Sequence, residues 1–497
     1  MASYLSLNKY SGTLKIPEFK GLNQYGDGIG LDPRYAMEVR NALTTEGVLR
    51  PMASHKLLPP TLPTPIETIA RLYRRWHPND TEREVLIAAS EGQLYWTLPD
   101  GVNWIQIALP EGWIGTRYQL STWSYVTYEI NEEGAEAPVD VILLSNAADG
   151  MIMVRGDTLT ASIVATPKKF GVIARHAERI WGGAIEDDPD TLVYSAPYNP
   201  FDWAANEEIP EDGAGDVMQP SWDGDSFMAL TTFGSQLIAF KKTRVWRILG
   251  TNPGEYTFKE QYGGGTSYPN TVVVDGNRIL MLGRDGLLQY NGESVYPYYQ
   301  EYASEIWKRL NHSVLDKSFA CKFGDSYFCA VPLDESQENN AVIIYNTVEH
   351  TWLLREGIRV EAFLPTEEHL YYTSTTTPGQ LWIWENDSIE AGDAEPMRWV
   401  SGWQDFGRHD TTLGGWMVYL TVECDAPVEL KVSIQTEKKL KTKTLAFEPP
   451  AEGKFAKHKR VSFGGNGRRF RLIIESESAV PWRLIGGMQI EAETDAD

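Results

Sequence analysis

The sequence predicts an all-β protein in which a β-propeller is followed by a jelly-roll-like β-sandwich. Three observations support this prediction: strands and turns recur at a nearly constant spacing, helical spacing of apolar residues is scarce, and the last hundred residues alternate in a different pattern. Of the 497 residues, 42% are hydrophobic and 11% aromatic, including 17 Trp and 24 Tyr. Aromatic side chains favour strands, so the composition agrees with the pattern.

The first 65 residues predict an extended segment rather than a folded domain. Glycine and proline interrupt one stretch at Gly26, Gly28, Gly30 and Pro33, and residues 57–65 are dense in proline. Proline breaks helices and favours extended backbone. We expect this segment to lie along a surface, to complete the propeller or to contact a partner.

Residues 66–390 predict the propeller. A unit recurs that consists of an apolar strand, a turn closed by glycine, and a second strand rich in Leu, Ile and aromatic residues. Its clearest copies are 85–101, 141–157, 278–293 and 370–386, and less regular copies are 171–184, 230–248 and 319–332, the last followed by 341–354. The turn glycines run from Gly92 through Gly150 and Gly286 to Gly379, a distance of 287 residues or six steps of about 48.

A spacing of about 48 residues is typical of one propeller blade. We therefore expect about seven blades, and six or eight would also fit the pattern. Two stacked sandwiches would explain the strands equally well but not the recurring glycine turn. Helical spacing appears in two places only. Residues 299–310 place Tyr302, Ile306 and Leu310 on one stripe, and residues 66–76 follow a cap-like Thr64-Pro65, so both stretches predict helices.

Residues 398–497 predict the sandwich. Short strands with clean alternation are evenly spaced along this stretch, as expected for two antiparallel sheets. The expected strands are 403–406, 417–423, 428–435, 443–449, 460–465, 468–476 and 488–493. The polar, acidic residues 387–397 mark the boundary between the two domains.

Charge is distributed unevenly along the chain. The formal net charge is −23, but residues 398–497 hold 15 Lys and Arg against 14 Asp and Glu, so the acidity belongs to the first four-fifths. Within residues 437–471, 11 basic residues stand against three Glu. This stretch is either a docking surface for an acidic neighbour or a pair of solvated hairpins. The candidate docking residues are Lys438, Lys439, Lys441, Lys443, Lys457, Lys459, Arg460, Arg468 and Arg469.

Several classes of protein do not fit the sequence. No run approaches the ~18 apolar residues that a membrane-spanning helix needs, and the first ten residues do not resemble a secretory signal. Three cysteines cannot build a disulfide framework or a four-cysteine zinc site, and we expect the protein to fold in a reducing cytoplasm. Cys321 and Cys329 lie on one predicted hairpin, and we expect both to be buried thiols. A large negative net charge argues against a protein whose main function is to bind duplex DNA, because the DNA backbone is also negatively charged.

No catalytic motif stands out, so we predict a protein that is not an enzyme and holds no cofactor or metal. The sequence contains no G-x-S-x-G, HExxH, CxxC or phosphate-binding P-loop, and its eight histidines are scattered singly. Residues 26–30 resemble a dinucleotide fingerprint only loosely and predict a turn. The alternative function is a carbohydrate-binding or carbohydrate-cleaving propeller.

That alternative needs carboxylate pairs and aromatic platforms. Acidic clusters at 186–190 and 207–216 offer carboxylates, although solvated loops explain them more simply. The tryptophans that offer platforms are Trp104, Trp113, Trp222, Trp382 and Trp384. Packing between blades is the simpler interpretation of these side chains.

Two stretches resemble the β-propeller virion proteins of tailed phages. The first is 19–52, with Gly21-Leu22-Asn23, Val39-Arg40-Asn41 and the turn Gly47-Val48-Leu49-Arg50-Pro51. The second is 239–298, in which a VWRI strand (245–248) leads through a Gly-rich loop to a YNG turn (290–292). The Arg-rich strand at 468–476 is also similar to the family's jelly-roll-like tail.

This resemblance implies a structural role in the tail of a virion that assembles in the host cytoplasm. Such proteins form a ring-shaped hub or nozzle, typically a homohexamer, below the portal and its adaptor ring. They retain packaged DNA, anchor fibres or spikes, and form part of the channel through which double-stranded DNA is ejected. Portal, adaptor and fibre or spike proteins are therefore the expected partners, with no insertion into a membrane.

Overall fold

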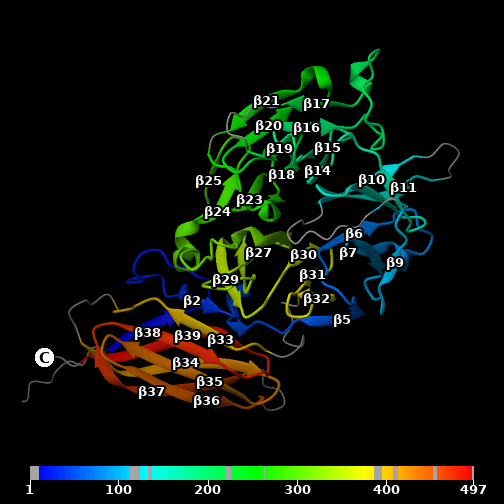
Figure 1. Cartoon of the computed structure of the whole chain (residues 1–497). Helices are drawn as coiled ribbons and strands as arrows, with labels where there is room; N and C mark the ends of the chain where they lie inside the picture. The colour runs from blue at the N-terminus through cyan, green and yellow to red at the C-terminus, as the bar shows by residue number, and fades with distance from the viewer. Residues whose placement is uncertain are drawn as a thin grey trace, which may run out of the picture.

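The computed structural model describes residues 11–111, 113, 124–131, 137–218, 225–261, 263–384, 394–406, 412–450 and 456–494. Over these residues the chain forms seven four-stranded antiparallel sheets arranged around a centre, next to a sandwich of two further sheets (Figure 1). The predicted fold class is confirmed: a seven-bladed propeller is followed by a β-sandwich.

In the first six blades the strands follow in chain order from the inside of the propeller outward, whereas the outermost strand of the seventh precedes the others in the chain. The first four blades are β6–β9 (Thr68–Tyr73, Glu84–Ser90, Gln93–Thr97, Ile105–Ile107), β10–β13 (Ser124–Ile130, Val139–Asn146, Gly150–Arg155, Ala161–Val164), β14–β17 (Val172–His176, Arg179–Gly183, Thr191–Tyr194, Gly215–Met218) and β18–β21 (Ala229–Phe233, Gln236–Phe240, Val245–Leu249, Thr257–Gln261). The last three are β22–β25 (Val273–Asp275, Arg278–Gly283, Gly286–Tyr290, Val295–Pro297), β26–β29 (Phe319–Phe323, Ser326–Val331, Ala341–Asn346, Thr351–Glu356) and β30–β32 (Ala362–Pro365, Leu370–Thr373, Gln380–Trp384) with β5 (Lys56–Thr61).

The repeated glycines close the turn between the second and third strands of four blades. Gly92, Gly150, Gly286 and Gly379 have φ angles of 73°, 102°, 137° and 80°, which side chains of L-residues rarely adopt. At Gly379 a Cβ atom would also lie 2.1 Å from the carbonyl oxygen of Leu62. The turn geometry therefore explains why the unit recurs with glycine at this place.

The outer strand of the seventh blade comes from the N-terminal segment. Strand β5 pairs antiparallel with β32, and the Leu62 amide donates to the Gly379 carbonyl at 2.8 Å. Leu58, Leu62 and Ile66 are buried in the cluster that joins blade seven to blade one. The ring is thus closed by a strand that precedes the rest of its blade by about 300 residues, which leaves no open edge between the first and last blades.

The sandwich also uses strands from the N-terminal segment. One sheet has the order β1 (Ser11–Ile16), β39 (Trp482–Thr494), β34 (Leu413–Cys424), β37 (Lys457–Gly467). The other has the order β2 (Ala36–Arg40), β33 (Met397–Ser401), β38 (Phe470–Ser476), β35 (Val428–Thr436), β36 (Leu440–Phe447). The sandwich therefore extends beyond residues 398–497, because β39 and β33 each pair with an N-terminal strand. Residues 387–393 of the predicted boundary lie outside the described residues.

The N-terminal segment also joins the two domains, because β2, the edge strand of one sandwich sheet, contacts β29 of blade six (Figure 1). The Leu22 amide donates to the Trp352 carbonyl at 2.8 Å, and the Asn41 amide donates to the Leu354 carbonyl at 2.9 Å. One buried cluster runs from blades six and seven through this segment into the sandwich. Continuous hydrogen bonding and a shared core make the junction a packed interface rather than a flexible linker.

The helix predicted over residues 66–76 is wrong, because this stretch contains the innermost strand of blade one. Residues Thr68 to Leu72 face neighbouring blades on both sides, so an apolar run that fits a helix stripe fits a buried strand equally well. The helix predicted over residues 299–310 is shorter than expected. Only a 3-10 turn (Gln300–Ala303) and one helical turn, α1 (Ser304–Trp307), form there.

Cys321 and Cys329 are buried free thiols, as predicted. A two-residue turn at 324–325 places Ala320 opposite Cys329 and Cys321 opposite Phe328. The two thiols therefore lie on opposite faces of the sheet. Burial raises the pKa of both thiols, so they remain protonated at neutral pH.

Candidate interaction surface and central channel

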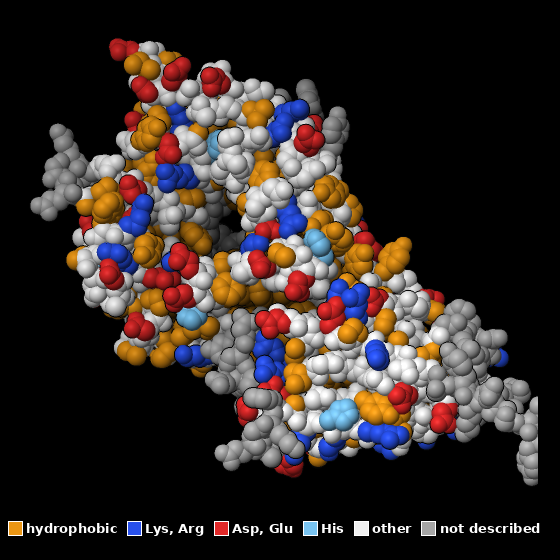
Figure 2. All heavy atoms as spheres, turned by 180° about the vertical axis from the view of Figure 1, so that it is seen from behind, with side chains coloured by type: hydrophobic (Ala, Val, Ile, Leu, Met, Phe, Trp, Pro, Cys, Tyr) orange, Lys and Arg blue, Asp and Glu red, His pale blue; other side chains and the backbone are white. Residues whose placement is uncertain are grey.

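The predicted docking residues lie at one side of the sandwich, on and between its two edge strands. Lys438 and Lys439 occupy the turn before β36, Arg468 and Arg469 the turn after β37, and the other five lie within these strands. Strands β36 and β37 end their respective sheets and lie next to each other, at the pole of the molecule farthest from the propeller (Figure 1). In Figure 2, Lys and Arg side chains gather along the lower rim of the sandwich. The β35–β36 hairpin and the segment from β37 to β38, which crosses from one sheet to the other, thus form one basic region.

Two lysines of β36 point toward the sandwich interior. Lys441 pairs with Ile434 and Lys443 pairs with Val432, and both of these β35 partners are buried. Cross-strand partners share a face, so the lysine stems extend over the apolar core while their ammonium groups reach water. The Lys443 ammonium lies 5.8 Å from the centre of the Phe463 ring.

Strand β37 supplies two more lysines of the same kind. Lys457 and Lys459 pair with the buried Val422 and Leu420 of β34. The Lys459 ammonium lies 5.0 Å from the centre of the Phe447 ring. We call Lys441, Lys443, Lys457 and Lys459 the lysine seam, because together they cover the open side of the sandwich between its two edge strands.

Glu437 holds the two basic turns together. Its carboxylate accepts hydrogen bonds from the backbone amides of Arg468 at 2.6 Å and Arg469 at 3.2 Å. Burial raises the pKa of Glu437, but these backbone donors and nearby Lys438 outweigh it, so the pKa lies below its usual range. Arg460 is separate from the seam: it lies on the outer face of its sheet, 5.6 Å from the centre of the Tyr419 ring.

The seam has a structural role besides any docking role. Edge strands present unpaired backbone groups to other chains, and inward-pointing charges hinder uncontrolled edge-to-edge pairing. The lysines of β36 and β37 are placed in this way. A partner that binds here must therefore satisfy the ammonium groups, which favours acidic surfaces over plain strand addition.

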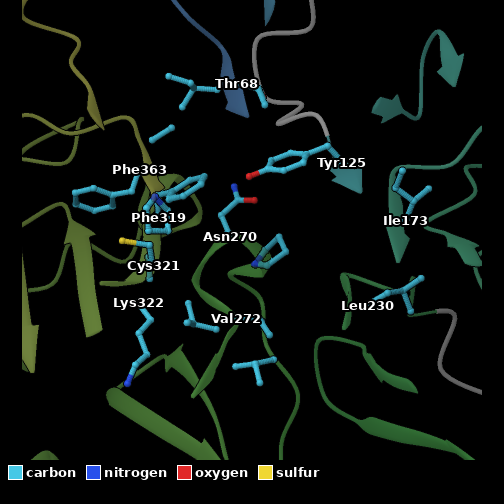
Figure 3. A pocket seen from close by; sticks show the side chains of 17 residues that line it. Thr68, Tyr125, Ile173, Leu230, Asn270, Val272, Phe319, Cys321, Lys322 and Phe363 are labelled. Atoms are coloured by element: carbon cyan, nitrogen blue, oxygen red, sulfur yellow. The ribbon is translucent and has the colours of Figure 1, made fainter. Parts of the chain in front are cut away.

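The second candidate site is the central channel of the propeller, which the sequence analysis did not identify. It has a volume of about 480 Å³ and takes lining residues from the innermost strand of each of the seven blades. Figure 2 shows the propeller hollowed at its centre, and Figure 3 shows the Tyr125 side chain pointing into this space near Asn270. The signal that could have located it is the strand that precedes each repeated unit, since that strand faces the axis.

The channel lining is mostly apolar. Its aliphatic and aromatic members include Ile173, Leu230, Val272 and Phe319. The Tyr125 side chain is 37% exposed, and the walls of the channel around it, with a smaller contribution from Cys321, raise its pKa to about 12. A volume of this size matches pockets for small ligands, about 300–1,000 Å³, and is far too small for a DNA duplex.

Lys322 supplies the only charge among the lining residues that the structure describes, and it is already paired. Its ammonium donates to Asp275, which also accepts from Arg278 at 2.8 Å. Burial raises the pKa of Asp275, but these two cations outweigh it and hold the pKa below its usual range. No carboxylate lines the described part of the channel, whereas glycoside hydrolysis needs two.

The other predicted carboxylates and tryptophans occur elsewhere. Asp190 pairs with the fully buried Lys241. In the 207–216 cluster, residues 207–212 lie on an exposed loop and Asp216 lies on β17. Trp384 is buried in the core and Trp382 stacks on Tyr372, as the packing interpretation expects. Trp222 lies outside the described residues, and within the described ranges no group of His, Cys, Asp and Glu could hold a metal ion.

The residues that carry the family resemblance lie at structural joints. Asn41 accepts from the Glu356 amide at 2.8 Å and donates to the Pro396 carbonyl at 3.1 Å, so it clamps the propeller to the sandwich. Arg247 of the VWRI strand donates to the carbonyl of Gly292 in the YNG turn at 2.9 Å. These contacts of Asn41 and Arg247 therefore stabilise the architecture.

The described part of the chain contains no helix long and apolar enough to cross a membrane. No protein-family model matches the sequence, and no curated protein matches it significantly. Among solved structures, BBS1N in complex with ARL6DN, soaked with lead, is similar at a TM-score of 0.38 and 10% identity, over 68% of this chain and 97% of that chain.

The same complex soaked with mercury gives a TM-score of 0.30 and 11% identity, over 66% of this chain and 81% of that chain. An exo-beta-1,3-galactanase from Phanerochaete chrysosporium gives 0.25 and 9%, over 81% of this chain and 93% of that chain. Similarities this distant carry no argument about activity or partners.

Proposed function

We propose that the chain is a structural subunit of a tailed-phage virion that forms a ring-shaped tail hub or nozzle below the portal and its adaptor. The observation that carries the proposal is the separation of charge: a basic region covers one pole of the sandwich, while residues 1–397 hold 54 Asp and Glu against 30 Lys and Arg. Oppositely charged surfaces on one chain favour contacts between neighbouring subunits. The resemblance of residues 19–52 and 239–298 to phage propeller proteins supports the same role.

In this assembly DNA would pass along the axis of the ring and not through a propeller. The propeller channel has a volume of only about 480 Å³ and an apolar lining. An acidic surface facing the ring axis would repel phosphates and keep DNA from adhering during ejection. Retention of packaged DNA and attachment of fibres or spikes would then depend on other faces of the ring.

The first experiment is the mass of the purified protein in solution, measured by light scattering at low and high salt. We expect a ring, with six copies as the expected number, or a monomer that forms one on the portal-adaptor complex. Charge reversal at Lys438, Lys439, Lys441 and Lys443 should weaken either assembly, because it removes the basic partner surface.

Assembly that survives this reversal would refute the docking role of the basic region. A persistent monomer that binds no virion component, yet retains or cleaves a glycan, would refute the hub and favour the carbohydrate-binding propeller instead. Screening glycan binding on the same samples separates these outcomes.

A further inference from the structure

The loop between β16 and β17 in blade three forms a projecting finger, residues 195–214, at the opposite end of the molecule from the lysine seam (Figure 1). Arg179 holds both ends of this finger. Its side chain is almost fully buried and donates to the carbonyls of Ser195 at 2.7 Å and Gly213 at 2.6 Å, and also to the Glu211 carbonyl. One buried guanidinium thus fixes the base of a twenty-residue loop.

The finger exposes large apolar side chains. Tyr198 is 76% exposed, Phe201 39% and Ile209 52%. The side chains of Asn199 and Asn206 accept hydrogen bonds from backbone amides within the finger, which fixes its conformation. A pre-formed projection with three exposed apolar side chains is typical of a contact surface, because burying them in a complex removes apolar area from water at little entropic cost.

The finger is also strongly acidic. Residues 195–214 contain five Asp and Glu and no Lys or Arg. Glu207, Glu208 and Glu211 are exposed and flank the exposed Ile209 in the chain, so carboxylates accompany this apolar side chain. A partner that fits must offer cations next to an apolar side chain.

We propose that the finger of one copy docks on the lysine seam of the next copy. The seam supplies four ammonium groups, and Leu440, 56% exposed, lies on the outer face of the same edge strand, next to Lys441 in the chain. Finger and seam lie at opposite poles, so each copy uses two different surfaces. Such head-to-tail contacts form a closed ring when the rotation between copies closes, and a filament when it does not.

This inference rests on the proposed docking role of the basic region and names its partner as a second copy of the chain. A charge-swap experiment tests it on the full chain. The finger variant carries Glu207→Lys, Glu208→Lys and Glu211→Lys, and the seam variant carries Lys441→Glu, Lys443→Glu and Lys457→Glu. Self-association is measured by sedimentation velocity at low and high salt, and folding by circular dichroism.

Each variant alone should associate at least about tenfold more weakly than the unmodified protein, because three attractive contacts become repulsive. An equimolar mixture should regain association, since the basic finger of one variant matches the acidic seam of the other. Recovery in the mixture would also show that neither variant lost association through misfolding. The control matched to the finger variant, Glu335→Lys with Glu367→Lys and Glu368→Lys, changes the net charge by the same amount on exposed loops of other blades and should associate normally.

The outcomes separate the two proposals. If the seam variant dissociates while the finger variant associates normally, the basic region docks a partner but the finger is not that partner, and this inference is overturned. If neither variant changes association, the docking role proposed above fails as well. Loss of duplex-DNA binding by the seam variant, without loss of self-association, would assign the seam to DNA and also overturn the inference.

Discussion

Replacing Leu58 by alanine tests whether the N-terminal segment closes the propeller. Leu58 lies on β5, is only 6% exposed, and packs in the cluster between blades seven and one with Leu381 and Ile383. A buried Leu→Ala change costs about 2–5 kcal/mol, because apolar contacts are lost and a cavity remains. Leu57 is its matched control: it neighbours Leu58 on the same strand but is 42% exposed, so Leu57→Ala should cost less than about 1 kcal/mol.

The assay combines urea unfolding, followed by tryptophan fluorescence, with hydrogen exchange of the β5 amides. Leu58→Ala should lower the urea midpoint without changing the slope, and should speed exchange in β5 by about 30-fold or more, the equivalent of 2 kcal/mol. Equal effects of the two substitutions, or unchanged exchange in β5 of the Leu58→Ala protein, would refute the pairing of this strand with blade seven.

Three further predictions follow from single positions. Gly379→Ala should destabilise the protein by more than Gly324→Ala in urea unfolding, because both have positive φ but only Gly379 has a backbone oxygen 2.1 Å from the added Cβ. Burial, and to a smaller extent the nearby Arg355, hold the pKa of His55 well below its usual 6.5. The stability that depends on the neutral ring is therefore present above about pH 6.5 and is lost as the pH falls. In the His55→Gln protein, the urea midpoint should fall less between about pH 7 and pH 5 than in the unmodified protein. The pKa of Tyr125 is raised to about 12, so the stability that depends on its neutral phenol is complete below about pH 10 and is lost as the pH rises. The absorbance titration of the Tyr125→Phe protein should lack one tyrosine ionisation near pH 12.

Much of the fold could be predicted because strands and turns are local. The glycines from Gly92 to Gly379 mark turns whose backbone angles only glycine adopts easily, and their spacing gives seven blades. Alternation located β34–β38 to within four residues, but β39 begins six residues before the expected 488, and the expected strand 403–406 forms only isolated bridges. The same local logic failed at residues 66–76, where burial on both faces of a strand produces an apolar run that also fits a helix.

The candidate site was predictable only in part. The sequence identified the basic residues and the 207–216 acidic cluster, because charge is visible without a structure. It gave no sign that Lys441 and Lys459 share the open side of the sandwich, since this depends on which strands end each sheet. The channel residues, such as Tyr125 and Asn270, were missed because their seven strands meet only in three dimensions.

The sequence by itself determined the strand content, the blade repeat and the uneven charge, because period-two alternation, turn glycines and ionisable groups act over a few residues. The tertiary structure alone decided where the N-terminal segment goes. Its strands β1, β2 and β5 pair with β39, β33 and β32, more than 300 residues away. Such pairings depend on which edges the rest of the chain leaves unpaired, and no local pattern encodes that competition.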